Sequence, residues 1–388
     1  MAKLCEYCQV NPARKGQKYC SNECNQHAYQ ARKAADVVAD PESPDQWAER
    51  AGAYLAEHHP LPPVPAIIQA TRREDMGFDT EQEGFALFSD LHLGSKIDPR
   101  ITAGMARYDT ARAVERLTRW RDGLLRFTQM DQYLIPLKTL NLAALGDDLE
   151  GHGAMFETQK FQMTDSIGFQ AMSFIDHMSS VILDLLSRYK HINVYKVRGN
   201  HGRISATAKG DYPPDNIELV AWQAIADRVR AQTGGDWSLS RNGIRLLRGG
   251  LVDFSISPAF MMTLSVMGYN VALRHGDGVG PVARTYTGLV DNKLRLNAIV
   301  GRMINYYFIA HHHEPQSVEH EIGGEAIVNG CFVGPSQLSV SMSRPAANIP
   351  SQEFFLFHPK HGLTHRHRIR LASAEEMRAD IEWLGEDE

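Results

Sequence analysis

From residue 84 onward, short apolar segments alternate with longer segments in which apolar residues recur about every three to four positions. The short segments predict buried strands, and the longer ones predict amphipathic helices. Strands are expected at 85–89, 140–145, 191–197 and 364–370, and helices at 108–130, 165–189, 216–232 and 282–303. This alternation predicts an α/β fold with two packed sheets, or with one sheet that has an antiparallel extension.

The first 35 residues form a separate pattern. Four of the five cysteines lie here, as a C-x2-C pair and a C-x3-C pair: Cys5, Cys8, Cys20 and Cys24. Two such pairs are typical of a structural zinc site, because each tight turn supplies two thiolates. Disulfides are the alternative, which a reducing cytosol disfavours. Residues 1–33 carry six lysines and arginines against two glutamates, so we expect this zinc finger to bind nucleic acid or a protein partner.

The remaining boundaries follow from composition. Residues 36–83 predict a linker that is partly helical and rich in proline, with an extended segment at 59–65. Residues 84–372 then form the main domain, and 373–388 form an acidic tail. On the strand predicted at 364–370, every second residue is an arginine, and these side chains would contact phosphates or pair with the acidic tail.

Charge and hydropathy exclude some classes of protein. The net charge of −5 argues against a protein coated in basic surface, although it allows a local basic groove. No apolar run approaches the roughly 18 residues that span a bilayer, so we expect no membrane partner. The first residues lack the apolar core of a signal peptide, which predicts a cytoplasmic location.

Metal-ligating residue types gather directly after the predicted strands. In chain order they are Asp90 and His92, Asp147 and Glu150, Asn200 and His201, then His275, and finally His311 and His313. The carboxyl ends of strands in an open α/β sheet converge on one crevice, so five such loops can surround one or two ions. Residues two apart in an extended chain point to the same side, which suits Asp90 with His92.

In this order, the motifs D-x-H, G-D, G-N-H, a lone H-G and H-x-H resemble those of the calcineurin-like metallophosphoesterase superfamily, over about residues 84–335. The G-N-H-G-R box at 199–203 and the segment 328–334 are similar to bacteriophage phosphoesterases of the DNA repair exonuclease type. The resemblance implies a two-sheet metallophosphoesterase sandwich flanked by helices, and a location in the cytoplasm of a phage-infected bacterium.

The resemblance also implies a ligand set. One ion would be held by Asp90, His92 and His313, the other by Asn200, His275 and His311, with Asp147 bridging both. A hydroxide shared by the two ions would be the nucleophile. Manganese is the ion that the resemblance favours, although iron, zinc or nickel would also suit these ligands.

Catalytic and substrate-binding roles follow in the same way. His201 would act as general acid or electrostatic stabiliser, and Glu150 would orient it and raise its pKa. Arg198 and Arg203 flank the G-N-H motif and are expected to contact substrate phosphate. Relatives commonly have an acid directly after the G-N-H histidine, whereas this chain has Gly202.

These expectations favour a two-metal phosphoesterase that hydrolyses phosphodiester bonds, as a DNA or RNA nuclease. A phosphomonoesterase or nucleotide phosphohydrolase is the alternative among enzymes, and a non-catalytic nucleic-acid-binding scaffold is the alternative from another class. The complete ligand set argues against a scaffold. The sequence leaves open exo or endo action, DNA or RNA, and the oligomeric state.

Overall fold

The computed structural model describes residues 21, 24–26, 44–66, 80–104, 106–153, 159–205, 212–278, 285–319, 324–341, 349–373 and 375–376. Three of the predicted zinc ligands, Cys5, Cys8 and Cys20, lie outside these residues, as does the tail beyond Glu376. The chain divides into two units, Met1–Trp47 and Ala48–Glu388. Helix α2 (Pro44–His58) falls in the segment predicted to be a partly helical linker.

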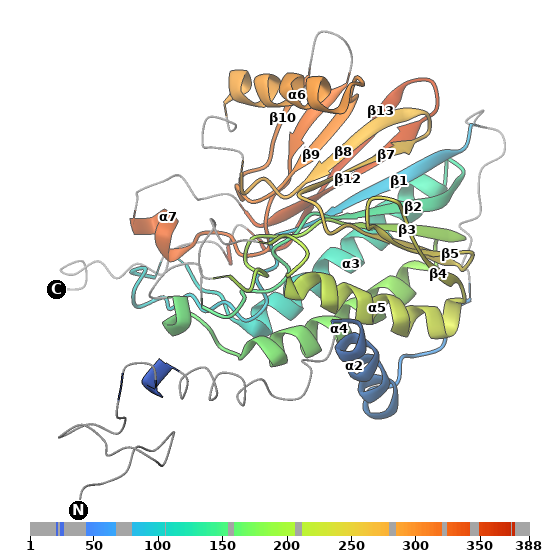
Figure 1. Cartoon of the computed structure of the whole chain (residues 1–388). Coiled ribbons are helices and arrows are strands. Elements are labelled where there is room, and N and C mark those ends of the chain that lie inside the picture. Colours follow the sequence, from blue (N-terminus) through green and yellow to red (C-terminus); the bar gives the residue numbers. More distant parts are fainter. Residues whose placement is uncertain are drawn as a thin grey trace, which may run out of the picture. The chain divides into compact units, whose positions relative to one another are not determined.

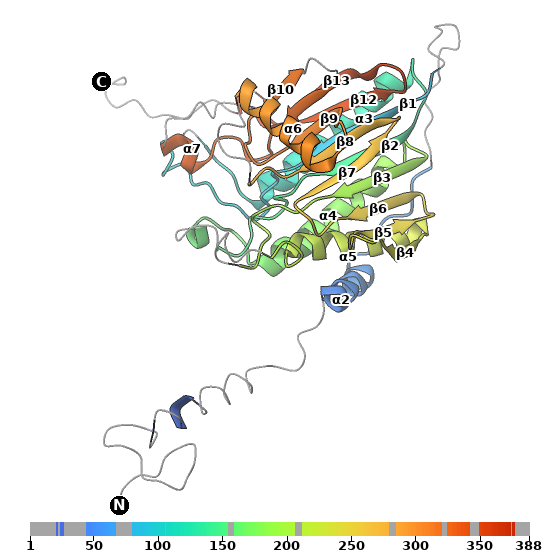
Figure 2. The same cartoon turned by 45° about the horizontal axis from the view of Figure 1, so that its top comes forward.

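The larger sheet of the second unit has eight strands in the order β13-β12-β1-β2-β3-β6-β5-β4. Its centre is parallel and consists of β1 (Gln82–Phe88), β2 (Leu137–Ala144), β3 (His191–Lys196) and β6 (Val252–Ile256), which lie side by side in Figure 2. Antiparallel strands extend both edges: β12 (Ser351–His358) and β13 (Gly362–Arg370) on one, and β5 (Arg245–Arg248) and β4 (Asp236–Leu239) on the other.

The smaller sheet has five strands in the order β10-β11-β9-β8-β7. Its three central strands run parallel and are β8 (Tyr269–Arg274), β9 (Tyr306–Ile309) and β11 (Glu325–Val328). Strands β7 (Met261–Val266) and β10 (Gln316–Glu319) pair antiparallel at its edges. The fold is therefore α/β with two sheets, and the predicted alternative of a single extended sheet is wrong.

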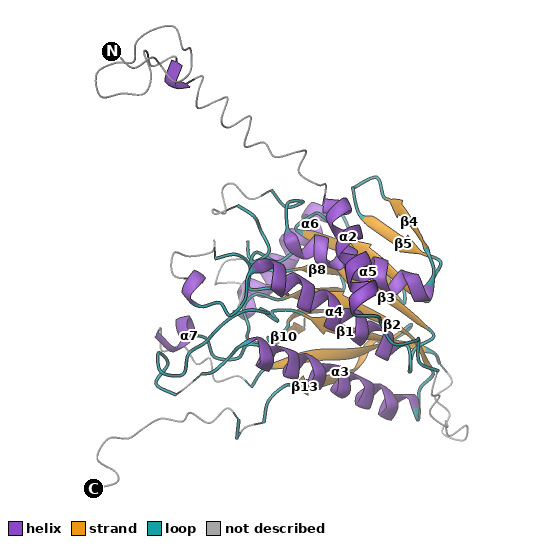
Figure 3. Ribbon diagram, turned by 90° about the horizontal axis from the view of Figure 1, so that it is seen from below, coloured by secondary structure: helices purple, strands orange, loops and turns teal. Residues whose placement is uncertain are grey.

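Helices cover the outer face of each sheet (Figures 1 and 3). The larger sheet carries α3 (Thr110–Gln132), α4 (Ile167–Leu185) and α5 (Ile217–Thr233), close to the helices predicted from sequence. The smaller sheet carries α6 (Tyr286–Val300), whose Leu289 and Leu296 pack with residues of β8, β9 and β11. Two shorter elements, η2 (Gln159–Phe161) and α7 (Gln337–Ser341), lie in connecting loops.

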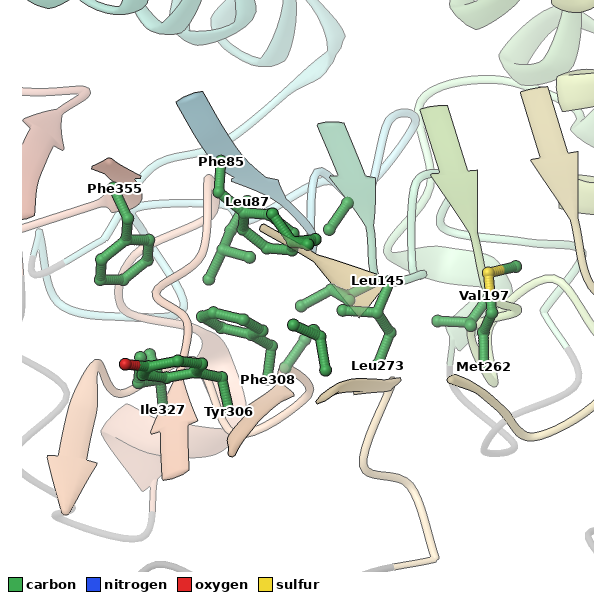
Figure 4. Packing of buried hydrophobic residues seen from close by; sticks show 14 of the residues in the cluster. Phe85, Leu87, Leu145, Val197, Met262, Leu273, Tyr306, Phe308, Ile327 and Phe355 are labelled. Atoms are coloured by element: carbon green, nitrogen blue, oxygen red, sulfur yellow. The ribbon is translucent and has the colours of Figure 1, made fainter. Parts of the chain in front are cut away.

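The main core lies between the two sheets (Figure 4). Phe85 of β1 stacks on Phe308 of β9 with ring centroids 4.7 Å apart. Leu145 and Val197, at the ends of β2 and β3, pack in the same cluster as Leu273 of β8. Strands buried on both faces read as continuous apolar runs, which is why the segment 85–88 is so hydrophobic. The core thus extends to the strand ends of both sheets, next to the loops that follow β2, β3 and β9.

The arginines of β13 pair within the sheet. Arg366 and Arg368 contact the two carboxylate oxygens of Glu353 on β12, at 3.0 and 2.7 Å, and Glu353 is fully buried. The tail residues beyond Glu376 lie outside the described part of the chain, so the expected pairing of these arginines with the tail stays a prediction. The tail residue Glu376 contacts Arg119 of α3 at 2.7 Å. Among the described residues, no helix is both long enough and apolar enough to cross a membrane.

Candidate metal centre

The predicted ligands follow parallel strands of both sheets. Asp90, Asp147 and Asn200 come directly after or soon after β1, β2 and β3, whose carboxyl ends share one edge. His275 follows β8, and His311 begins the loop after β9, on the second sheet. Because the two sheets pack face to face, these loops meet, and the structure brings all seven predicted ligands together.

The backbone at this edge is strained. Of the seven non-glycine residues with positive φ in the described part of the chain, five are predicted ligands: Asp90, His92, Asp147, His311 and His313, with φ between 47° and 70°. Side chains with a Cβ disfavour this conformation, and such residues cluster at functional sites. The strain therefore marks the loops independently of the motifs.

Asp90, His92 and His313 form the first cluster. His313 Nε2 lies 3.3 Å from Asp90 Oδ1 and 3.3 Å from His92 Nε2. The Nδ1–H of His92 donates to Glu150 Oε2 at 3.0 Å, so its Nε2 carries the lone pair toward His313. Two imidazole nitrogens and a carboxylate oxygen that converge in this way fit a divalent cation.

Asp147, His275 and His311 form the second cluster. His275 Nε2 lies 3.0 Å from Asp147 Oδ2 and 2.9 Å from Asn200 Oδ1. Its Nδ1–H donates to the carbonyl of Leu145 at 2.8 Å, which aims Nε2 at the centre. Asp147 Oδ2 is also 3.8 Å from His92 Nε2, so this carboxylate faces both clusters. The donor set fits two ions that share Asp147.

Burial and neighbouring charges together set the pKa values of the carboxyl and imidazole groups at the centre. Burial raises the pKa of Asp90, but the charge of His313 outweighs it, and the pKa falls to about 2. Burial lowers the pKa of His275, but Asp147 and Asp90 outweigh this and raise it to about 9. Burial and the neighbouring His275 together lower the pKa of His311 to about 4. Buried carboxylates thus lie directly beside imidazoles whose pKa values they raise.

His201 stands beside these two clusters, and together with His92 and Asp147 it forms a third group of donor atoms that converge closely enough to hold an ion. Its Nδ1–H donates to the backbone carbonyl of Glu150 at 3.0 Å, and its Nε2 faces Asp147 Oδ2 at 4.0 Å. Its backbone N–H donates to Asp147 Oδ1 at 2.9 Å. Burial opposes a charged ring, but Asp147 and Glu150 outweigh this and raise the pKa of His201. The ring is therefore held with one nitrogen directed at the centre.

Glu150 and Gln159 support these rings. The Glu150 carboxylate lies 3.0 Å from His92 Nδ1 and 3.6 Å from His201 Nδ1, so its closer partner is the ligand histidine. The Gln159 amide donates to Glu150 Oε1 at 2.8 Å and lies 3.3 Å from His201 Nδ1. Sequence reasoning missed Gln159, because no motif or spacing connects it to the metal loops.

Arg198 and Arg203, which were expected to contact substrate phosphate, are both buried. Arg198 is 1% exposed, donates to the carbonyl of Gly199 at 3.1 Å and lies 3.4 Å from Asp277. Its guanidinium carbon lies 4.4 Å from the ring centre of Phe260. Arg203 is 8% exposed. A carboxylate, a carbonyl and an aromatic ring thus surround Arg198, and the contact of the two arginines with substrate phosphate stays a prediction.

The sequence matches no protein-family model and no curated protein. Solved structures with some similarity include Vacuolar Protein Sorting 29 from Cryptosporidium parvum, at 10% identity and a TM-score of 0.34, covering 75% of this chain and 99% of that chain. A second is an archaeal phosphodiesterase, at 10% identity and a TM-score of 0.30, covering 74% and 99%. A third is wild-type Vps29 from Entamoeba histolytica complexed with zinc, at 11% identity and a TM-score of 0.28, covering 74% and 99%. Similarity at this level assigns neither family nor activity.

Proposed function

We propose that the protein is a two-metal phosphoesterase that hydrolyses phosphodiester bonds of nucleic acid. The observation that carries the proposal is the carboxylate of Asp147, which lies between two clusters of imidazole and carboxylate donors. Two divalent cations held there would polarise a phosphoryl oxygen and acidify water. This donor set, with manganese, iron, nickel or zinc as candidates, favours catalysis over an idle scaffold.

His201 is the proposed proton donor. Its Nδ1–H is engaged by the carbonyl of Glu150, so the proton available for transfer is at Nε2, on the side of the metal clusters. The raised pKa keeps a larger share of the ring protonated near neutral pH. A proton at this atom can neutralise the oxygen that leaves phosphorus when a phosphoester bond breaks.

Exposed aromatic rings near the centre support a nucleic-acid substrate. The described chain has three exposed phenylalanines: Phe161 in η2, Phe169 in the first turn of α4 and Phe260 in the loop before β7, at 74%, 74% and 48% exposure. Bases stack on such rings, each with about 1–3 kcal/mol. A phosphomonoesterase needs only a pocket for one phosphoryl group, so these rings would have no role in it.

Two of these phenylalanines are close in sequence to residues that hydrogen-bond loops of the centre. Phe161 is two residues from Gln159, which contacts Glu150, and Lys160 lies 5.2 Å from the Phe161 ring centre. Phe169 precedes Gln170, whose side chain hydrogen-bonds both the N–H and the carbonyl of Gly151, at 3.0 Å each. We propose that a strand bound at the centre stacks its bases on these two rings.

The test is a substrate panel with added Mn²⁺. We expect cleavage of single-stranded and duplex DNA or RNA, and slower hydrolysis of a phosphomonoester. An abasic oligonucleotide separates stacking from phosphate binding, since Phe161→Ala with Phe169→Ala should slow cleavage of the base-bearing strand only. Rapid monoester hydrolysis without cleavage of either nucleic acid would decide for the phosphomonoesterase, and no turnover of any substrate would decide for the scaffold.

We also propose that the N-terminal module holds one structural zinc at its four cysteines and contacts the nucleic acid. Its positive balance within an acidic chain supports this role, because basic residues contact phosphates and release counterions. A protein partner is the alternative occupant. Deleting residues 1–35 separates the two, because only a module that contacts nucleic acid changes the salt dependence of nucleic-acid binding.

A further inference from the structure

A fully buried glutamate lies beneath the metal loops, in the first turn of α5. Glu218 Oε1 accepts the backbone N–H of Asp148 at 3.0 Å, and its Oε2 accepts the backbone N–H of Gly199 at 3.0 Å. Asp148 directly follows the shared ligand Asp147, and Gly199 directly precedes the ligand Asn200. One carboxylate thus connects the loops that supply two of the predicted ligands.

We propose that Glu218 is a positioning residue that fixes the spacing of these two loops and so adapts the site to a pair of ions. The inference rests on the proposed function, because it concerns how the same metal centre is assembled. Glu218 belongs to none of the metal motifs, and in the described hydrogen bonds it touches no predicted ligand side chain. It acts through the backbone at Asp148 and Gly199.

The charges around Glu218 favour a positioning role. Lys196 at the end of β3 contacts both Asp148 Oδ2 and Glu218 Oε2, the latter at 3.0 Å, and all three side chains are fully buried. Trp222 Nε1 of α5 donates to Asp148 Oδ2 at 2.7 Å. Buried ion pairs are weak contributors to stability, and apolar residues of similar size often replace them without loss. Such a network is therefore better explained by the geometry that it imposes.

The first turn of α5 holds Gly199 from both sides. Asn216 Nδ2 donates to the carbonyl of Gly199 at 2.8 Å, while Asn216 Oδ1 caps the helix by accepting the N–H of Glu218 at 3.0 Å. A Cβ on Gly202 would lie 2.4 Å from Asn216 Oδ1 and 2.7 Å from Glu218 Cγ. This close packing explains why glycine follows His201 in this chain: a side chain at 202 would displace the residues that hold Gly199.

The two loops also pack against each other with no room for a side chain. A Cβ on Gly199 would lie 2.1 Å from the backbone nitrogen of Asp147 and 2.3 Å from its Oδ1. A small shift of either loop would therefore move Asp147 relative to Asn200. A carboxylate that accepts one N–H from each loop opposes that shift directly.

The test is Glu218→Gln, compared with Glu353→Gln as a matched control. The glutamine carbonyl can accept only one of the two N–H groups, and its NH₂ then faces the other donor or Lys196. Glu353 of β12 is an equally buried glutamate whose two arginine partners lie on β13. Its substitution therefore costs stability without touching the two loops. Both full-length variants are titrated with Mn²⁺ by calorimetry and by electron paramagnetic resonance, alongside thermal melts.

We expect Glu218→Gln to weaken Mn²⁺ binding by about 10- to 100-fold, the range for residues that orient metal ligands, and to change the spectrum of the coupled ion pair. Glu353→Gln should lower the melting temperature yet keep wild-type Mn²⁺ affinity and spectrum. Wild-type Mn²⁺ binding by a destabilised Glu218→Gln would overturn the inference. Failure of the wild-type chain to bind a pair of Mn²⁺ ions would instead overturn the proposed function.

If Glu218→Gln does not fold, Asn216→Asp tests the same contact between the start of α5 and Gly199. Aspartate is as good a helix cap as asparagine, so the helix keeps its acceptor, but the donor to the Gly199 carbonyl is lost. We expect weaker Mn²⁺ binding with little change in melting temperature. Unchanged Mn²⁺ affinity in this folded variant would count against a positioning role for the first turn of α5.

Discussion

His201→Ala separates catalysis from metal binding. The variant keeps the backbone N–H that donates to Asp147 Oδ1, and it leaves the Glu150–His92 contact in place. We therefore expect both ions to remain bound while turnover falls by a factor of about 10² to 10⁴, the usual contribution of a general acid or base.

The magnitudes show why this loss cannot be a stability effect. The ring gives up one hydrogen bond, from Nδ1 to the Glu150 carbonyl, which is worth about 1 kcal/mol net. The expected fall in turnover corresponds to about 3 to 5 kcal/mol in the activation barrier. A protein destabilised by the smaller amount stays folded under assay conditions, so the kinetic effect must come from the missing proton donor.

The pH profile gives a second readout. Asp147 and Glu150 raise the pKa of His201 above its ordinary value, against the opposing effect of burial. The His201 ring is therefore protonated below that pKa and loses its proton as the pH rises through it. Wild-type turnover should show this alkaline limb, and His201→Ala should lack it.

The assay is hydrolysis of a small chromogenic phosphodiester over a range of Mn²⁺ concentrations and pH. His152→Ala is the control, because the His152 ring donates to the carbonyl of Arg203 at 2.9 Å and belongs to neither metal cluster. Loss of an ion from His201→Ala, or an equal kinetic loss in His152→Ala, would refute the role given to His201.

Three further predictions concern protons, packing and the N-terminal module. The pKa of His275 is raised to about 9 and that of His313 well above its usual value, so both are protonated at pH 7 and must release protons when cations bind. Mn²⁺ affinity should therefore rise from pH 7 to 9, and calorimetry in two buffers should give different enthalpies; identical enthalpies would contradict this. Gly199→Ala should lose Mn²⁺ binding, because its Cβ would lie 2.1 Å from Asp147 N. Gly168→Ala is the control, since its Cβ would have nothing within 4 Å, and it should bind Mn²⁺ normally. Equal Mn²⁺ binding by the two variants would contradict the packing argument. Deleting residues 1–35 should weaken nucleic-acid binding and flatten its salt dependence but leave hydrolysis of a small phosphodiester unchanged, and an unaltered salt slope would decide for a protein-docking module.

The sequence predicted which loops converge at the candidate metal centre, because strand ends and metal-ligating residue types are local signals. Asp90, Asp147 and Asn200 follow short apolar runs, and a parallel sheet brings the ends of such runs to one edge. The pairing of the two sheets was harder to predict, since β7 to β11 are short and their order depends on contacts distant in sequence.

Supporting residues could not be predicted in this way. Gln159 and Glu218 belong to no motif, and their roles depend on where η2 and the first turn of α5 lie in three dimensions. The burial of Arg198 has a related cause, because Asp277 and Phe260 provide an environment for it that the local sequence does not indicate. Local sequence thus specifies ligand types, and tertiary packing specifies what orients them.

The metal content of the wild-type chain and of Asp147→Asn tests the central claim most directly. Asp147 Oδ2 lies 3.0 Å from His275 and 3.8 Å from His92, so this one oxygen serves both clusters. Two unit charges about 4 Å apart attract each other by about 4 kcal/mol at an effective dielectric constant of about 20, so for a divalent cation the loss of this carboxylate charge costs each site at least roughly a thousandfold in affinity. After equilibration with Mn²⁺, elemental analysis should find about two manganese ions per wild-type chain and fewer than one in Asp147→Asn. A single manganese in the wild-type chain, or two retained by Asp147→Asn, would contradict the account.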